Sequence, residues 1–290
     1  MKPTTQPLKR YPQRLNTHDH SREIVGMTYV YPVISRRAGG VSVGINLNPN
    51  NACNWQCVYC QVPNLVRGGP PPIALDQLAR ELDGLLNDIL HGDFMAQRVD
   101  PDVRHLVDIA FSGNGEPTSA AEFPEAVDIA IEALDRYALR GKVLLRLITN
   151  GSLVDRPRVQ SGIARIGSAP GEVWFKIDAA SDKEISQING TRTTAERVAR
   201  RLQRCIAIAP TWVQTCVFLR DGAFAAGAGW DDYLRLLASA DSNLRGVHLY
   251  SLARTSMQNE SSRLGQLDMV QMEFLAAQIR HLGLAVTVNP

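Results

Sequence analysis

The chain contains 290 residues, of which 44% are hydrophobic and 21% charged, and its formal net charge is +2. This is the composition of an ordinary globular protein, and the net charge is too small to indicate a polyanionic partner. The longest apolar run without a charged residue, 205–219, is interrupted by Pro210 and is shorter than the ~20 residues that span a bilayer. Because the first forty residues also lack a signal-peptide stretch, we expect a cytoplasmic protein without a membrane segment.

Basic residues are concentrated near the N-terminus. Residues 1–40 carry two acidic side chains and seven basic ones: Lys2, Lys9, Arg10, Arg14, Arg22, Arg36 and Arg37. Clustered cations of this kind can contact phosphates of nucleic acids. A solvated tail is the preferred interpretation, and His18 and His20 are interpreted as solvent-exposed.

Between residues 41 and 250, short β-like runs alternate with amphipathic helical runs. The strand-like runs lie at 41–48, 106–111, 143–149, 172–178, 212–219 and 246–250, with an additional one at 284–288. Apolar spacing predicts helices at 78–89, 129–137, 155–166, 194–209, 230–240 and 268–282. This alternation is typical of βα units around a parallel sheet.

The two faces of the predicted strands differ, because alternate side chains point to opposite sides. One face is apolar: Val41, Val43, Ile45, Leu47, Val173, Phe175, Ile177, Val247 and Leu249. The other is polar: Ser42, Asn46, Asn48, Asp108, Arg146, Asn150, Lys176, Asp178, Gln214 and His248. A closed barrel fills its interior with branched apolar side chains, so a polar interior predicts a cavity for a polar ligand. The alternative is a solvated face, which parallel sheets seldom have.

Three cysteines, Cys53, Cys57 and Cys60, follow the first strand within eight residues. Thiolates bind both zinc and iron-sulfur clusters, but a structural zinc site normally uses four ligands. Cys205 and Cys216 are interpreted as buried small apolar residues. A cluster of four irons held by three thiolates has one iron open to a small molecule. Because a fourth cysteine is missing from the motif, we predict an iron-sulfur cluster. A zinc site with one recruited ligand is the alternative.

The Cys-x3-Cys-x2-Cys spacing, with Tyr59 before the last cysteine, resembles the signature of the radical S-adenosylmethionine (SAM) superfamily. The resemblance implies a partial (βα)6 TIM-like barrel over residues 31–290, the catalytic domain, after a basic extension over residues 1–30. It implies that a 4Fe-4S cluster and SAM are the cofactors, with Tyr59 beside the adenine. Reductive cleavage of SAM would give a 5′-deoxyadenosyl radical that abstracts hydrogen from a substrate. A one-electron reductant such as flavodoxin or ferredoxin is the implied partner.

Further motifs follow the second and third strands. One resembles the glycine-rich segment that meets the SAM amino group in this superfamily, and contains Gly113, Gly115, Glu116 and Pro117. Asn150 lies in a Thr-Asn-Gly turn that resembles the turn near the SAM ribose or carboxylate. Taken alone, each segment could be an ordinary turn.

Charged and polar residues also end the later strands. Lys176 and Asp178 are interpreted as ligands of the SAM carboxylate and ribose, or of the substrate, since unmatched charges inside a barrel are costly. The candidate substrate contacts are Gln214, His248, Tyr250 and Arg254, because barrel active sites gather on the loops after the strands. A structural role is the alternative for His248.

From Tyr31 to about Arg254 the chain also resembles a branch of radical SAM proteins related to the wyosine-forming tRNA enzymes. Those enzymes carry additional N-terminal cysteines, and none precedes Cys53 here, which speaks against their pyruvate-condensing reaction. The substrate alternatives are tRNA, a protein side chain and a small molecule. The non-catalytic alternatives are a zinc-binding protein and a degenerate member with a redox or structural iron-sulfur cluster, although Glu116 and Lys176 are intact.

Overall fold

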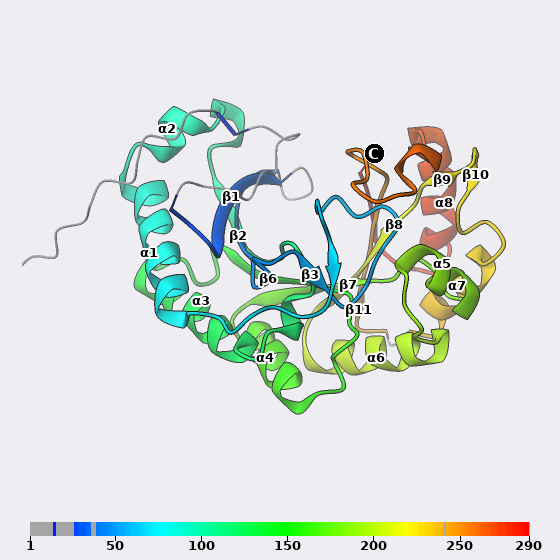
Figure 1. Ribbon diagram of the computed structural model, residues 1–290, viewed down its shortest axis with the longest axis horizontal. Helices are drawn as coiled ribbons and strands as arrows, with labels where there is room; N and C mark the ends of the chain where they lie inside the picture. Colours follow the sequence, from blue (N-terminus) through cyan, green and yellow to red (C-terminus); the bar gives the residue numbers. More distant parts are fainter. Residues whose placement is uncertain (1–13, 16–25, 36–38, 241, 290) are drawn as a thin grey trace, which may run out of the picture.

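The computed structural model describes residues 14–15, 26–35, 39–240 and 242–289. An eight-stranded sheet of order β1-β2-β5-β6-β7-β8-β11-β13 curls through the centre, with helices on its outer side (Figure 1). Its strands are β1 (Val30–Ser35), β2 (Gly40–Ile45), β5 (Leu106–Phe111), β6 (Leu144–Thr149), β7 (Gly171–Lys176), β8 (Thr211–Cys216), β11 (Leu244–Tyr250) and β13 (Val286–Asn289). Neighbouring strands are parallel except for the antiparallel pair β1 and β2. The predicted partial barrel is therefore confirmed.

The helices and the minor strands complete the alternation. The main helices are α1 (Leu75–His91), α3 (Phe123–Arg136), α4 (Pro157–Ser168), α6 (Ala195–Ile208), α7 (Trp230–Ala238) and α8 (Met269–Arg280). The shorter helices are α2 (Phe94–Arg98), α5 (Asp182–Asn189), η1 (Pro101–Val103), η2 (Pro117–Ser119) and η3 (Ser261–Arg263). The minor strands are β3 (Ala52–Cys53), β4 (Val66–Arg67), β9 (Leu219–Arg220), β10 (Ala223–Phe224) and β12 (Leu264–Gly265).

The predicted main helices are confirmed, whereas β1 and α5 were not predicted. Helix α5 is only eight residues long, too short for a clear apolar period. Its ends are nevertheless well defined. The Ser181 hydroxyl accepts a hydrogen bond from the Glu184 N–H, and Gly190 ends the helix in a left-handed conformation at φ 59°.

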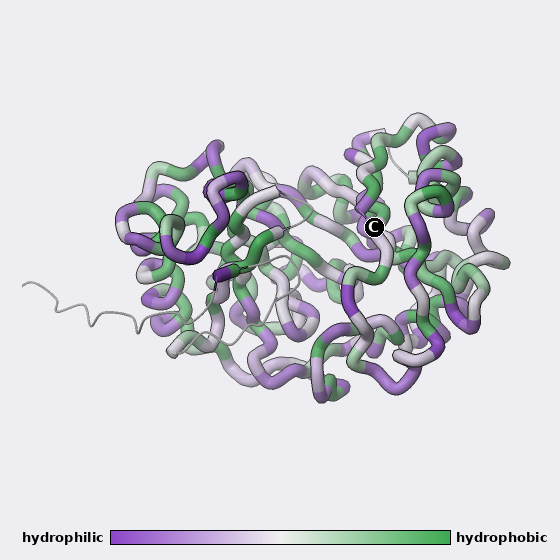
Figure 2. Tube along the Cα trace, turned by 90° about the horizontal axis from the view of Figure 1, so that it is seen from above, coloured by the Kyte–Doolittle hydropathy of each residue, from purple (hydrophilic) through white to green (hydrophobic). Residues whose placement is uncertain are grey.

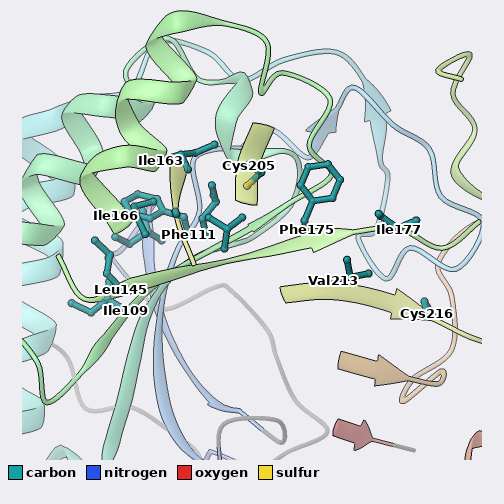
Figure 3. Packing of buried hydrophobic residues seen from close by; sticks show 14 of the residues in the cluster. Ile109, Phe111, Leu145, Ile163, Ile166, Phe175, Ile177, Cys205, Val213 and Cys216 are labelled. Atoms are coloured by element: carbon teal, nitrogen blue, oxygen red, sulfur yellow. The ribbon is translucent and has the colours of Figure 1, made fainter. Parts of the chain in front are cut away.

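The hydrophobic core lies between the outer face of the sheet and the helices. Figure 3 shows Ile109, Phe111 and Leu145 of the sheet packed near Ile163 and Ile166 of α4. All five are fully buried, and each such side chain contributes roughly 1.5–3 kcal/mol. In Figure 2, green and purple alternate along the outer helices, as expected when one helix face packs on a sheet.

The inner face of the sheet is polar, as predicted. The buried polar residues include Ser42, Asn46, Asn48, Asp108, Arg146, Asn150, Asp178, Gln214 and His248. Lys176 is partly buried at the end of β7. The strands therefore enclose hydrogen-bonding groups at their centre and apolar groups outside.

A buried ion network occupies the amino-terminal end of this interior. The Arg146 guanidinium forms an ion pair with Asp108 and donates from Nε to Glu172 Oε1 at 2.8 Å. It also lies 4.1 Å from the centroid of the Trp174 ring. Ser42 donates to Asp108. These partners offset the desolvation of three charged groups, which would otherwise be costly.

The basic N-terminal extension lies mostly outside the described residues, and so do His18 and His20. Arg14 is described, and its guanidinium contacts the Asp100 carboxylate at 3.1 Å in an exposed pair. Within the described ranges, no helix combines the length and hydrophobicity needed to cross a bilayer.

Candidate active site

A cavity of about 330 Å³ lies at the carboxyl ends of the strands. Twelve of the residues predicted from the sequence line it: Cys53, Cys57, Tyr59, Cys60, Gly113, Gly115, Glu116, Asn150, Lys176, Gln214, Tyr250 and Arg254. Pro117, Asp178 and His248 are not among its lining residues. The fold therefore brings segments at the ends of five strands, β5, β6, β7, β8 and β11, together with the cysteines to one space.

The cysteine loop, residues 53–66, is held by other elements through its backbone. The short strands β3 and β4 pair in parallel and close the loop at its base. The Val58 N–H donates to the Ile188 carbonyl of α5 at 2.9 Å, and the Met257 N–H donates to the Cys60 carbonyl at 2.9 Å. These hydrogen bonds fix the backbone of a loop that has little regular secondary structure of its own.

The Cys53 and Cys57 thiols each accept a hydrogen bond. The Trp55 N–H points at Cys53 Sγ at 3.4 Å, and the Asn189 amide donates to Cys57 Sγ at 3.4 Å. Burial raises the pKa of Cys53 to about 11 and that of Cys57 to about 12. Because metals bind thiolates, metal loading at this loop must release protons and is favoured by higher pH.

The thiols do not converge on a single-ion site. Within the described ranges, no group of three or more His, Cys, Asp or Glu side chains is placed to hold one metal ion. A cubane iron-sulfur cluster requires a different arrangement of thiols, since each thiolate binds a separate iron. Three thiolates beside a cavity fit a cluster that leaves one iron open.

Glu116 joins the glycine-rich segment to the end of β6. Its carboxylate accepts hydrogen bonds from the Thr118 hydroxyl at 2.6 Å, the Thr149 hydroxyl at 2.6 Å and the Asn150 N–H at 2.7 Å. The side chain is 2% exposed and lines the cavity. Glu116 therefore positions two candidate cofactor-binding segments relative to each other.

Gly115 lies where the glycine-rich segment meets the cysteine loop. A Cβ at this position would overlap the Ala52 carbonyl oxygen and lie 2.7 Å from Asn48 Nδ2, closer than real Cβ atoms approach. We expect Gly115→Ala to displace the backbone before Cys53, lowering the free energy of unfolding by about 1–3 kcal/mol and reducing iron bound after reconstitution. Urea denaturation and iron analysis measure the two effects.

Gly69 provides a matched control, because a Cβ there would meet nothing within 4 Å. Gly69→Ala should retain both stability and iron content. Equal behaviour of the two variants would contradict the proposed close packing at Gly115.

Asn150 and Asn54 link the turn after β6 to the cysteine loop. The Asn150 amide donates to Asn54 Oδ1 at 2.9 Å, and the Asn54 amide donates to the Ser152 hydroxyl at 2.7 Å. Asn54 stands next to Cys53 in the chain. The Thr-Asn-Gly turn thus supports the cysteine loop as well as lining the cavity.

Asp178 is a positioning residue rather than a group that faces the cavity. Its carboxylate accepts hydrogen bonds from the Tyr59 hydroxyl, the Asn189 amide at 2.7 Å and the Cys216 N–H at 2.9 Å. Its side chain is fully buried. That Asp178 is a direct SAM or substrate ligand stays a prediction, and its oxygen atoms are engaged by these protein donors.

Lys176 reaches the cavity from the end of β7. Its Nζ lies 2.8 Å from the Tyr250 hydroxyl and 3.8 Å from Asp178 Oδ1. Burial lowers the pKa of Lys176, but Asp178 and Tyr250 raise it by more, so the pKa lies above the ordinary lysine value. The side chain is a cationic hydrogen-bond donor at neutral pH.

His248 lies in an aromatic layer instead of at the cavity lining. Its ring stacks on Trp212 with centroids 4.5 Å apart and lies 4.4 Å from the Trp174 ring. Its Nδ1 is 2.6 Å from the Thr287 hydroxyl of β13. That His248 contacts substrate stays a prediction, and the contacts of its ring with both neighbouring strands favour the structural alternative.

Cys216 is buried, as predicted, but the sequence interpretation did not identify it as a cavity residue. It lines the cavity beside Gln214. The two residues are separated by one position in β8 and therefore face the same side. Strand periodicity could have identified it. Asn189 was also missed, and no sequence signal marked it, because its helix was not predicted.

Gln214 presents an amide to the cavity floor. The residue is 2% exposed, lines the cavity, and its side chain has no hydrogen bond to any residue that the structure describes. Buried amides usually have a partner. This side chain is therefore suited to bind a polar group of a ligand.

The pKa of Glu116 gives a pH-dependent prediction. Burial raises this pKa, although hydrogen bonds from Thr118, Thr149 and Asn150 oppose the shift. The folded chain thus holds the proton more tightly than the unfolded chain, so the free energy of unfolding falls as pH rises above the ordinary value of about 4.3. We expect the free energy of unfolding of Glu116→Gln, which cannot titrate, to rise relative to that of the wild type as pH rises above about 4.3.

Urea denaturation at several pH values measures this difference. The control is Glu125→Gln. At Glu125 burial raises the pKa, but the Arg158 guanidinium lowers it by more, so the net shift is downward. Its variant should differ from the wild type by a constant amount over the same rise in pH, because a lowered pKa changes stability only below the ordinary value of about 4.3. If plots of unfolding free energy against pH for Glu116→Gln and the wild type run parallel, the prediction is contradicted.

Comparison with known proteins identifies proteins that are similar to this chain. A UPF0026 protein of Methanocaldococcus jannaschii is 29% identical over 164 residues, which cover 54% of this chain and 42% of that protein. The chain spans less than half the length of the curated relatives it matches.

Two solved structures share the fold. One is a radical SAM methyltransferase from Sphaerobacter thermophilus, with a TM-score of 0.58, 16% identity, and coverage of 92% of this chain and 71% of that chain. The other is TYW1 with a lysine-pyruvate adduct bound, with a TM-score of 0.56, 17% identity, and coverage of 84% and 74%.

The family model described as the radical SAM superfamily matches residues 47–221. This segment includes the three clustered cysteines, the glycine-rich segment, the Thr-Asn-Gly turn and Lys176. The superfamily consists of enzymes that use a 4Fe-4S cluster and SAM. The match covers more than half of the chain, and the chain belongs to the radical SAM superfamily.

Proposed function

We propose that Cys53, Cys57 and Cys60 hold the 4Fe-4S cluster and that the adjoining cavity holds SAM and a substrate from which hydrogen is abstracted. The observation that carries this proposal is the meeting of three thiols with Glu116 and Lys176 at one cavity. Bound together, the cluster and SAM supply a reductively generated 5′-deoxyadenosyl radical. A fourth protein thiol would not be needed, since SAM would occupy the iron that the three cysteines leave open.

The residues of the chain divide into two roles in this proposal. Tyr59, Asn150 and the backbone at Gly113 and Gly115 form the SAM-binding wall, with Glu116 orienting Asn150 and the glycine-rich segment. Lys176 offers positive charge to a carboxylate of SAM or substrate. Its high pKa supports this role and argues against imine formation, which needs the neutral amine. A pyruvate adduct like the one bound to TYW1 is therefore not proposed for Lys176.

The substrate is proposed to lie on the side of the cavity formed by Gln214, Tyr250 and Arg254. All three line the cavity, and they extend from β8 and from β11 into the loop after it. Arg146 is not assigned to substrate binding, because Asp108 and Glu172 already engage its guanidinium. Uncharged polar groups on the substrate would match Gln214.

Anaerobic reconstitution tests the proposal directly. We expect about four irons and four sulfides per chain, and release of 5′-deoxyadenosine when SAM and dithionite are added. Tightly bound zinc without a nucleoside product would contradict it. Profiling of RNA nucleosides and metabolites from cells with and without the gene then separates tRNA from small-molecule substrates.

A further inference from the structure

Helix α8 carries apolar side chains on its outer side as well as on the side that packs against the sheet. Four side chains of its inner side belong to the core: Met272, Leu275, Ala276 and Ile279. On the outer side, Val270 is 80% exposed and Phe274 is 68% exposed, which makes them the two most exposed large hydrophobic side chains among the described residues. Single apolar side chains on a surface need no explanation, but neighbouring ones on one helix face can mark an interaction site.

These two side chains belong to a stripe along the helix. Val270, Phe274, Ala277 and His281 follow one another at spacings of four, three and four residues, and all four are exposed. His281 continues the stripe, because its φ of −61° and ψ of −19° are still helical. With about 3.6 residues per turn, this spacing aligns the side chains on one face, as in the seam of a coiled coil. The core residues lie on the opposite face, so the stripe points away from the sheet.

The residues beside the stripe have a charge pattern that complements itself. Glu273 and Arg280 lie along one side of the stripe, where they form an ion pair at 2.7 Å, and Gln271 and Gln278 lie along the other. When two copies of such a helix pack in opposite directions, each side of the stripe meets the same side of the partner's stripe. If the copies cross at the middle of the stripe, Glu273 of each copy faces Arg280 of the other. The four charges then alternate in sign.

We propose that the α8 stripe, defined by Val270, Phe274, Ala277 and His281, packs against the same stripe of a second copy of this chain in an antiparallel, two-fold symmetric contact. Such a contact uses the same surface patch on both copies, as in most homodimers of soluble proteins. The crossing lies between Phe274 and Ala277, so the large phenyl ring of one copy packs on the small alanine of the other. Val270 of each copy then lies opposite His281.

Two other arrangements fit the stripe less well. In a parallel pair, Phe274 would meet Phe274, and Glu273 would face the uncharged Gln278. A helix that lies on a membrane surface usually has a polar face rich in Lys and Arg, whereas Arg280 is the one basic residue of Met269–Arg280. A second copy, by contrast, supplies both the apolar partner and the opposite charges.

The contact also leaves the active site accessible. Among the residues that the structure describes, none from α8 lines the cavity. In Figure 1, α8 lies at the opposite end of the molecule from α1. The proposed dimer therefore goes beyond the proposed function and does not depend on it.

Sedimentation velocity of the reconstituted full chain tests the contact at concentrations from about 1 to about 100 µM, which bracket a micromolar Kd. One pair of 12-residue helices is at the small end of protein interfaces, so we expect a Kd in this range and a species of twice the 31.9 kDa chain mass. Phe274→Glu should raise the dimer Kd about tenfold or more, because it places a carboxylate in the apolar contact. Met257→Glu is the matched control. Met257 is 57% exposed and lies outside α8, so its variant should dimerise like the wild type.

Charge reversal gives a second test that leaves the apolar residues intact. Glu273→Arg and Arg280→Glu each place like charges opposite one another in a homodimer, so each should raise the Kd about five- to tenfold. Mixing the two variants restores opposite charges at both positions, and they should form a heterodimer with a Kd close to that of the wild-type dimer. Fluorescence anisotropy with one labelled variant measures this Kd.

Several results would overturn the proposal. One is a wild-type chain that stays monomeric at about 100 µM. Another is a dimer that Phe274→Glu does not weaken. A mixture of the two charge variants that associates no more tightly than either variant alone would exclude the antiparallel contact. So would a monomer that binds vesicles of phosphatidylcholine and phosphatidylglycerol through Phe274 and forms no dimer.

Discussion

Cys57→Ser is expected to lower dithionite-driven 5′-deoxyadenosine formation by more than about 100-fold. The estimate follows because loss of a group that merely supports a metal ligand already costs roughly 10- to 100-fold, and this substitution removes a proposed ligand. The same loss is expected for Cys53→Ser and Cys60→Ser. Product is quantified by chromatography after anaerobic reconstitution, together with iron and sulfide content.

Cys205→Ala is the matched control, since Cys205 is fully buried on α6 and accepts a hydrogen bond only from the Thr211 hydroxyl, at 3.5 Å, among the described contacts. It should lose some stability and keep its iron. Asn189→Ala should give an intermediate loss, because its amide bonds to Cys57 Sγ and to Asp178. Full iron content and product formation in Cys57→Ser would contradict the ligand assignment.

Arg146→Met is expected to lower the free energy of unfolding by about 3–5 kcal/mol, because it leaves Asp108 and Glu172 without their shared cation. The Arg146 and Asp108 side chains are 7% and 2% exposed, so the orphaned carboxylates would be poorly solvated. Burial already raises the pKa of Asp108, although Arg146 and Ser42 oppose the shift. Methionine keeps much of the packing against Trp174, which isolates the effect of charge. Urea denaturation followed by circular dichroism measures it.

Arg136→Met provides the comparison at an exposed ion pair. Arg136 contacts Asp83 at 2.7 Å, with side chains 58% and 44% exposed, and its loss should cost at most about 1 kcal/mol. Adding Asp108→Asn to Arg146→Met should recover part of the lost stability, because one orphaned charge is removed. Similar losses for Arg146→Met and Arg136→Met would show that the interior network is not stabilising.

Local sequence determined the positions of most secondary-structure elements and the candidate thiols. The strands near β2, β5, β6, β7, β8 and β11 carry apolar residues at alternate positions, and that period alone assigned Val173 and Phe175 to the core and Gln214 to the interior. The cysteine spacing is also local, since three thiols within eight residues remain close in any fold. These predictions needed no knowledge of how distant segments meet.

Only the tertiary structure decided what each polar group contacts. Asp178 and Lys176 look equivalent in sequence, but Asp178 is surrounded by donors from the cysteine loop, α5 and β8, whereas Lys176 reaches the cavity. The His248 ring contacts the rings of Trp174 and Trp212 because β11 lies beside β8 and β8 lies beside β7. Hydrogen bonds between segments far apart in the chain depend on how the loops cross the sheet. Residue type and spacing do not show how the loops cross the sheet. They therefore identified the chemistry of this chain but not the residues that position its functional groups.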